Sequence, residues 1–203
     1  MTATLDITSR GIDERTADVL FRDAHTAYSF TGAAPSDAQL ARIYDLVRHA
    51  PTAMNGQPLR ITYVRSHEAK ARLLPLLAEG NRAKAASAPV VAILAADTDF
   101  HLNLHRTLPH LPNAAAMFAE DAAREQAARF NAHIQAGYFI LAVRAAGLDA
   151  GPMRGIDAAA IDAEFFAGTP LRSFLAVNIG EVADGGSFPR SPRLEQHEAV
   201  TVL

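Results

Sequence analysis

The sequence predicts an α+β protein with a single hydrophobic core. A continuous apolar run over residues 89–96 is typical of a strand that is covered on both faces, and residues 173–179 are expected to form another buried strand. Helical patterns lie between them, but strands and helices do not alternate regularly, which argues against a parallel βαβ sheet. The 203 residues contain no repeat and no internal linker, so we expect one domain over residues 1–203.

Each helix is predicted from its apolar spacing and its end signals. The first helix is expected over residues 13–23, with Val19 and Leu20 facing the core. The second begins after Ser36, which can form a capping box with Gln39, and a proline ends it. Three more helical segments are expected, over residues 67–78, 113–147 and 156–166.

The remaining features are a buried helix, a strand and two arms. The helical region near residues 130–145 is apolar nearly all round, and Gly147 is a natural C-cap. Such a helix is buried either in the core or by a second subunit, and the sequence leaves both open. A strand is expected over residues 60–65. Residues 1–12 are expected to form a loose N-terminal arm and residues 183–203 an extended C-terminal arm.

The composition excludes several classes of function. Nineteen Lys and Arg against 22 Asp and Glu give a net charge of −3, which argues against a nucleic-acid partner. The chain has no cysteine, so disulfides, thiol catalysis and thiolate metal sites are excluded. No signal peptide and no membrane-length apolar run is found, so we expect a cytoplasmic location. The motifs G-x-G-x-x-G, G-x-x-x-x-G-K-[ST] and G-x-S-x-G are also absent.

The most informative segment is the loop of residues 50–60, A-P-T-A-M-N-G-Q-P-L-R, which joins the second helix to the first strand. It combines backbone N–H groups, a hydroxyl and carboxamides with two prolines that restrict its shape. These features suit a loop that holds a flat polar ligand. The loop also resembles the A-P-[ST]-x-x-N-x-Q-P-[WL]-R signature of the FMN-dependent nitroreductase superfamily.

The resemblance to this superfamily extends from about Val19 to the end of the chain, through several motifs in order. It implies a nitroreductase-like fold, with a central, mostly antiparallel sheet wrapped by helices, and an intertwined homodimer with FMN at the subunit interface. It also implies an oxidoreductase in which NADH or NADPH reduces the flavin and leaves before a small-molecule substrate is reduced in turn. Because the cofactor carries this chemistry, no catalytic side chain is expected.

Three motifs are similar to those that hold the flavin ring in the superfamily. Asn81 and Lys84 match residues at the pyrimidine edge, where an ammonium group stabilises the reduced flavin. By itself, Lys84 would be interpreted as an exposed helix charge. Residues 147–157 resemble a segment whose main chain passes flavin N5, and they would otherwise be a C-cap, a turn and a helix start. In this segment the expected flavin contacts are Pro152, Met153, Arg154 and Gly155. In the loop of residues 50–60, Thr52, Ala53, Asn55 and Gln57 are expected to contact FMN across the subunit interface.

The phosphate end departs from the superfamily pattern. The usual R-S-x-R is replaced by His25, Thr26 and Tyr28, which can bind phosphate with less fixed positive charge. The basic C-terminal element contributes Arg190 and Arg193, of which Arg193 is the better match, whereas Arg190 could equally be an ordinary tail residue. We therefore expect FMN to be held more by its ring than by its phosphate.

The substrate and one histidine cluster leave alternatives open. Within the superfamily, residues 50–55, 80–81, 151–153, 165–168, 177–180 and 192–194 are similar to the malonic semialdehyde reductase branch, which forms 3-hydroxypropanoate. A broad nitroaromatic or quinone reductase would use the same residues. A flavin-binding protein without activity is a third interpretation. His101 and His105 have the i,i+4 spacing of some zinc sites, with His110 nearby, but H-E-x-x-H is absent. Exposed loop histidines are favoured over a metal site, in a segment expected to cover the flavin pocket.

Overall fold

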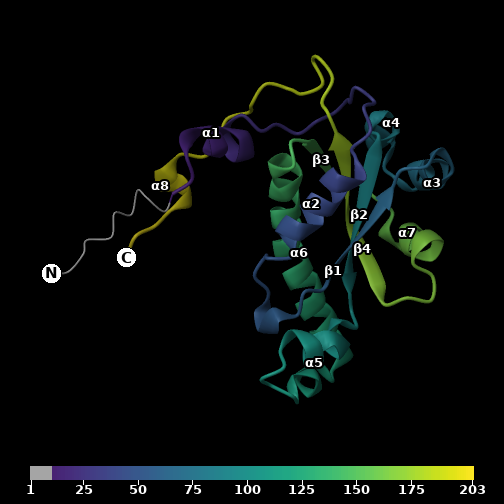
Figure 1. Ribbon diagram of the computed structural model, residues 1–203, viewed down its shortest axis with the longest axis vertical. Helices are drawn as coiled ribbons and strands as arrows, with labels where there is room; N and C mark the ends of the chain where they lie inside the picture. Colours follow the sequence, from purple (N-terminus) through teal and green to yellow (C-terminus); the bar gives the residue numbers. More distant parts are fainter. Residues whose placement is uncertain (1–10) are drawn as a thin grey trace.

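The computed structural model describes residues 11–203 and centres on a four-stranded antiparallel sheet (Figure 1). The strand order is β1-β2-β4-β3. The bounds are β1 Leu59–Val64, β2 Val90–Asp97, β4 Leu171–Gly180 and β3 Asp149–Met153. All three strand pairs are antiparallel, so the predicted antiparallel sheet is confirmed.

The sheet order determines where the functional segments lie. The two central strands, β2 and β4, were predicted as buried strands, and every residue of β2 is buried. The edge strand β1 pairs with β2 from Leu59 opposite Ala96, and the edge strand β3 pairs with β4 from Asp149 opposite Gly180. Segments that adjoin β1 and segments that adjoin β3 therefore lie at opposite edges of the sheet.

Helices cover both faces of the sheet and enclose one apolar cluster on each (Figure 1). The helices α2 (Asp37–Val47) and α6 (Asp121–Ala145) pack on one face. The helices α3 (His67–Leu73), α4 (Glu79–Ser87) and α7 (Ala158–Phe165) lie on the other. Short 3-10 turns span Ala53–Asn55, Leu74–Leu76, Phe100–Asn103 and Ala114–Phe118, and α5 spans Leu104–Thr107.

The helical ends agree with the sequence where local chemistry decides them. The amide of Gln39 donates to the Ser36 hydroxyl at 3.2 Å, and the amide of Ser36 donates to the Gln39 side chain at 3.0 Å, so the capping box is confirmed. Gly147 follows α6 with φ of 76°, the left-handed conformation of a C-cap glycine. The predicted helical region over residues 113–147 consists of a 3-10 turn followed by the continuous helix α6.

The edge strand β3 and the helix α4 were not predicted. Residues 149–153 form the edge strand β3 instead of a turn, although they contain Gly151 and Pro152, which disfavour strands. An edge strand tolerates such residues because only one of its two sides is paired within the sheet. On the other side of β3, the segment before Phe30 passes by, and the amide of Ala27 donates to the carbonyl of Ala150. The helix α4 was missed because its alanines and polar residues show no apolar stripe.

Both ends of the described chain extend away from the sheet (Figure 1). The helix α1 (Glu14–Ala17) continues as one π-helical stretch, Asp18–Arg22, and α8 (Gln196–Ala199) lies in the C-terminal tail. The prediction that Val19 faces the core is wrong, because its side chain is half exposed. Most of the predicted N-terminal arm lies outside the described residues. Among residues 11–203, no helix is long and apolar enough to cross a membrane.

Candidate functional site

The sequence-predicted site residues form two separate groups in this chain. One group adjoins β3 and consists of residues from the segment before Phe30, from α4, from the end of β3 and from the C-terminal tail. The other is the strained loop, residues 52–57, which leads into β1. Because β1 and β3 are opposite edges, one chain does not bring the two groups together.

A cleft of about 590 Å³ contains the predicted phosphate-binding residues. Its lining includes His25, Thr26, Tyr28, Arg190 and Arg193, so the structure brings all five together. The His25 Nδ1 donates to the carbonyl of Phe188 at 2.9 Å, which leaves Nε2 available to a ligand. The ring of Phe188 also packs edge-on against Tyr28, with centroids 4.7 Å apart, and this pairing joins the tail to the N-terminal segment.

The charge of this cleft comes mainly from arginines, one of which the sequence did not reveal. Arg144, near the end of α6, lines the cleft together with Arg190 and Arg193, and no Asp or Glu is among the residues that line it. Arg144 donates to the carbonyl of Leu20 at 2.8 Å, but its Nε is buried and has no hydrogen-bond partner within residues 11–203. Burial, followed by the charge of Arg190, lowers the pKa of Arg144. An anion bound in the cleft would stabilise the charged form of Arg144 and so offset both its burial and the repulsion from Arg190.

The two tail arginines are partly used by the protein itself. Arg190 donates to the carbonyls of Arg22 and Ala24, and it thereby holds the tail against the N-terminal segment. Arg193 donates to the carbonyl of Ser191 at 2.8 Å. These bonds orient both guanidinium groups at the rim of the cleft, and neither is paired with an acid within residues 11–203.

The predicted ring-edge residues adjoin this cleft. The Lys84 Nζ lies 4.6 Å from the centroid of the Tyr28 ring, which links α4 to the phosphate-binding segment. The Asn81 side chain donates to the carbonyl of Gly155 at 3.0 Å. A Cβ at Gly155 would lie 2.7 Å from Asn81 Nδ2, so only glycine permits this approach. Pro152 and Met153 lie on β3, and Arg154 is exposed just after it.

The strained loop holds three non-glycine residues in the left-handed region. Met54, Asn55 and Gln57 have φ of 53°, 51° and 45°, which is rare outside glycine. Between them, Gly56 packs so closely that a Cβ would meet the Phe100 ring at 2.9 Å. Such strain costs free energy and is concentrated at functional sites, so the loop conformation is one that the surrounding structure has to maintain.

Buried amides of α6 maintain this conformation. The Asn131 side chain accepts a hydrogen bond from Ala53 N–H at 2.7 Å, and the Gln135 side chain accepts one from Leu59 N–H at 2.9 Å. The Asn55 side chain donates to the carbonyl of Thr107 at 2.7 Å. Asn131 and Gln135, in a helix expected to be apolar nearly all round, are therefore buried polar residues that serve this loop and β1. Two amides in an otherwise apolar helix are the signal that could have identified them.

Replacing Gln135 by methionine tests this anchoring. The substitution keeps the volume but leaves Leu59 N–H buried without an acceptor, which is expected to cost about 1–3 kcal/mol of stability. Urea-induced unfolding followed by circular dichroism measures the loss. Gln126, exposed on the same helix, provides the matched control, and Gln126→Met is expected to change little. Equal stability of the two variants would contradict the anchoring role.

The segment of residues 100–107, which contains His101 and His105, lies next to the strained loop. Phe100 packs against Gly56, and the carbonyl of Thr107 holds Asn55, so residues 100–107 form the second support of this loop. His105 donates to the carbonyl of Leu102 at 2.8 Å. Within residues 11–203 no group of three or more His, Cys, Asp or Glu side chains could hold a metal ion.

Solved structures with this architecture are nitroreductase-like proteins. A nitroreductase in complex with FMN from Exiguobacterium sibiricum superposes with a TM-score of 0.82 at 19% identity, over 95% of this chain and 98% of that one. An NAD(P)H:FMN oxidoreductase from Staphylococcus epidermidis superposes with a TM-score of 0.83 at 17% identity, with the same coverage. These similarities establish the fold class.

The sequence comparisons define the family. Residues 22–181 match the Nitroreductase family. A Streptomyces griseus protein named NADH dehydrogenase/NAD(P)H nitroreductase is 52% identical over 195 residues, which are 95% of this chain and 98% of that protein. A protein of the same name from Leptothrix cholodnii is 45% identical over 196 residues, 96% of this chain and all of that protein. The chain belongs to the nitroreductase family, as the sequence motifs predicted.

Proposed function

We propose that this protein is an FMN-dependent NAD(P)H oxidoreductase. The observation that carries the proposal is the acid-free cleft beside β3, where Arg144, Arg190 and Arg193 meet His25 and Tyr28. Family membership and the names of the relatives from Streptomyces griseus and Leptothrix cholodnii support the same activity. The cytoplasmic location expected from the sequence, where NAD(P)H is available, is part of the proposal.

The residues of this cleft fit the phosphate of FMN. Phosphate binds best to arginine groups and to hydroxyl donors, and the cleft offers both. The unpaired Nε of Arg144 is a buried donor that lacks an acceptor, and phosphate oxygens are acceptors only. In the family pattern two arginines stand at the positions of His25 and Tyr28. Arg144 thus supplies positive charge that these two residues do not.

The ring-edge residues fit the flavin ring. When bound, FMN supplies hydride uptake at N5 from NAD(P)H and hydride delivery to a second substrate. In the proposal, Lys84 provides a fixed positive charge at the edge of the ring that becomes negative on reduction. The main chain of Arg154 and Gly155 provides N–H donors toward N5, and the Asn81 bond to Gly155 O keeps that main chain in place.

We also infer that the active protein is an intertwined homodimer. A flavin held beside β3 of one chain would lie far from Thr52, Ala53, Asn55 and Gln57 of the same chain, because they adjoin the opposite edge. A second copy would supply that loop. Phe130 and Tyr138 of α6 are 66% and 43% exposed, and a partner would cover this aromatic surface. The exposed C-terminal tail, which lies away from the sheet, would extend over the partner (Figure 1).

For the natural substrate we propose malonic semialdehyde, reduced to 3-hydroxypropanoate. The support is the similarity of several short segments to the malonic semialdehyde reductase branch: residues 50–55, 80–81, 151–153, 165–168, 177–180 and 192–194. A broad nitroaromatic or quinone reductase is the alternative, and the names of the relatives from Streptomyces griseus and Leptothrix cholodnii favour it.

Four measurements test these proposals in order. The purified protein is expected to be yellow, or to become yellow with FMN, and to elute at the mass of a dimer. NADH or NADPH is expected to bleach the bound flavin under anaerobic conditions. A colourless protein that takes up no FMN would overturn the cofactor assignment, and a flavin that is never bleached would indicate a flavin-binding protein. Relative kcat/KM for malonic semialdehyde and a nitroaromatic then identifies the substrate class.

A further inference from the structure

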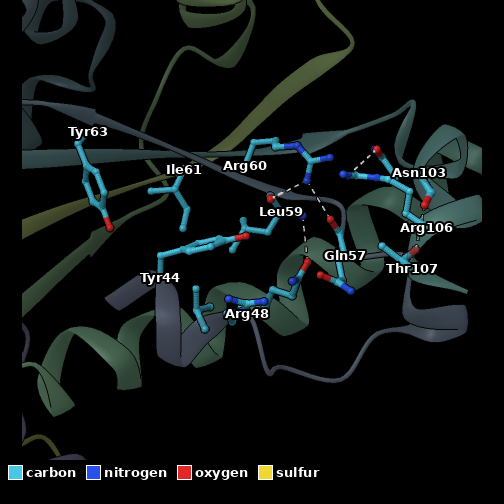
Figure 2. A pocket seen from close by; sticks show the side chains of 13 residues that line it. Tyr44, Arg48, Gln57, Leu59, Arg60, Ile61, Tyr63, Asn103, Arg106 and Thr107 are labelled. Atoms are coloured by element: carbon cyan, nitrogen blue, oxygen red, sulfur yellow. Dashed lines mark hydrogen bonds between the residues drawn. The ribbon is translucent and has the colours of Figure 1, made fainter. Parts of the chain in front are cut away.

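A second cavity of about 580 Å³ lies between α2, β1 and α5, beside the strained loop (Figure 2). Its volume is within the range of small-molecule sites, roughly 300–1,000 Å³. Gln57 belongs both to the strained loop and to the cavity wall, and Thr107, which holds Asn55, lines the cavity as well. The cavity therefore adjoins the part of the chain that the proposed dimer places against FMN.

The polar lining of this cavity is strongly cationic. Arg48, Arg60 and Arg106 line it, and no Asp or Glu is among the lining residues, although the whole chain has a net charge of −3. Figure 2 shows the three arginines with Gln57 and Asn103 around one space. Three uncompensated arginines in one cavity would repel each other, so their individual partners decide what the cavity can bind.

Among the described residues, one of the three arginines is paired with an acid. Arg60 forms an ion pair with Asp97 at 2.5 Å and donates to the carbonyls of Gln57 and Leu59, so its bonds serve the fold. Arg106 donates to the Asn103 side chain at 3.2 Å, and neither Arg48 nor Arg106 has an acid within ion-pair distance in residues 11–203. Two guanidinium groups thus remain available for an anion.

The other end of the cavity is apolar and aromatic. Tyr44, Ile61 and Tyr63 form this wall, as Figure 2 shows. The Tyr63 hydroxyl is buried and has no hydrogen-bond partner in the described part of the chain, and burial raises the pKa of Tyr63 to about 12. The hydroxyl therefore remains a donor at neutral pH. An apolar body with an acceptor at one end and an anionic group at the other would satisfy this lining.

We propose that this cavity binds the carboxylate of the substrate that the flavin reduces, with Arg48 and Arg106 as its specificity-determining residues. A carboxylate matches the planar guanidinium donors, and the volume leaves room for an aromatic ring between the tyrosines. The inference rests on the proposed function, because it takes the strained loop to face FMN. It predicts that acids, such as a semialdehyde acid or a nitrobenzoate, are favoured over neutral acceptors.

A matched pair of acceptors tests the proposal in the FMN-loaded protein. 4-Nitrobenzoate and nitrobenzene undergo the same reduction and differ by one carboxylate. The variants Arg106→Met and Arg48→Met are each expected to raise the KM for 4-nitrobenzoate about tenfold, because a charge-assisted hydrogen bond is lost, and to leave nitrobenzene within about twofold. Arg42→Met, on an exposed part of α2 outside the cavity, is the control. Equal effects on both acceptors, or none, would overturn the proposal.

Direct binding separates this inference from the proposed function. Benzoate cannot be reduced, so its affinity, measured by saturation-transfer NMR, reports the cavity with or without flavin. Binding that weakens about tenfold in Arg106→Met supports the carboxylate site even if the protein proves unable to use NAD(P)H. A protein that reduces nitrobenzene but binds no benzoate would retain the proposed function and lose the carboxylate site.

Discussion

Replacing Arg144 by methionine is expected to weaken FMN binding by about ten- to a hundredfold, and to change riboflavin binding far less. A hydrogen bond to a charged group contributes roughly 1.5–3 kcal/mol, which corresponds to that range of affinity. Riboflavin lacks the phosphate, so it does not need the charge in the cleft. Equilibrium titration of the apoprotein, followed by quenching of flavin fluorescence, gives both dissociation constants.

Two controls separate the phosphate contact from a structural role of Arg144. Arg144 also anchors the π-helical stretch through the carbonyl of Leu20, so its loss could disturb the cleft as a whole. Such a disturbance would weaken FMN and riboflavin alike. Arg129→Met, on an exposed turn of the same helix, removes a charge outside the cleft and is expected to leave both affinities unchanged. If Arg144→Met weakened the binding of FMN and of riboflavin to the same extent, the assignment of Arg144 to the phosphate would be refuted.

The fold could be predicted where burial leaves a continuous or periodic apolar pattern. The runs that became β2 and β4 are covered on both faces, and α2 has both an apolar stripe and the capping box of Ser36 and Gln39. The strand β3 has no such pattern, because its pairing with β4 and the crossing chain at Ala27 determine it. Tertiary hydrogen bonds of this kind leave little trace in local sequence.

The residues of the candidate site show the same distinction between local sequence motifs and tertiary contacts. Residues within motifs, such as Asn81 and Gly155, could be identified separately, and the structure then shows that they bond to each other. Arg144 could not be identified, because it belongs to no motif and reaches the cleft only through the packing of α6 against the chain near Leu20. Gln135 was hidden likewise, since its partner, Leu59 N–H, is known only when α6 and β1 are placed together.

Replacing Lys84 by methionine is expected to slow flavin reduction by NAD(P)H about a hundredfold, with most of the FMN still bound. In the proposal the Lys84 ammonium stabilises charge that develops at the ring edge on reduction, and removing one such preorganised group typically costs a factor of 10²–10³ in rate. Anaerobic stopped-flow absorbance measures the reduction rate, and the flavin content of the purified variant measures retention. Lys84→Arg, which keeps the charge, is expected to recover part of the rate.

The contact between Lys84 and Tyr28 provides the decisive comparison. Lys84 Nζ lies 4.6 Å from the Tyr28 ring centroid, so Lys84 could act only by holding the phosphate-binding segment in place. In that case Tyr28→Leu would slow reduction as much as Lys84→Met does, and Lys84→Met would weaken FMN binding. If the ammonium stabilises the reduced ring, Tyr28→Leu changes mainly FMN affinity, and Lys84→Met makes the bound flavin harder to reduce, with a lower reduction potential. The potential therefore distinguishes a charge that acts on the flavin from a charge that supports its binding site.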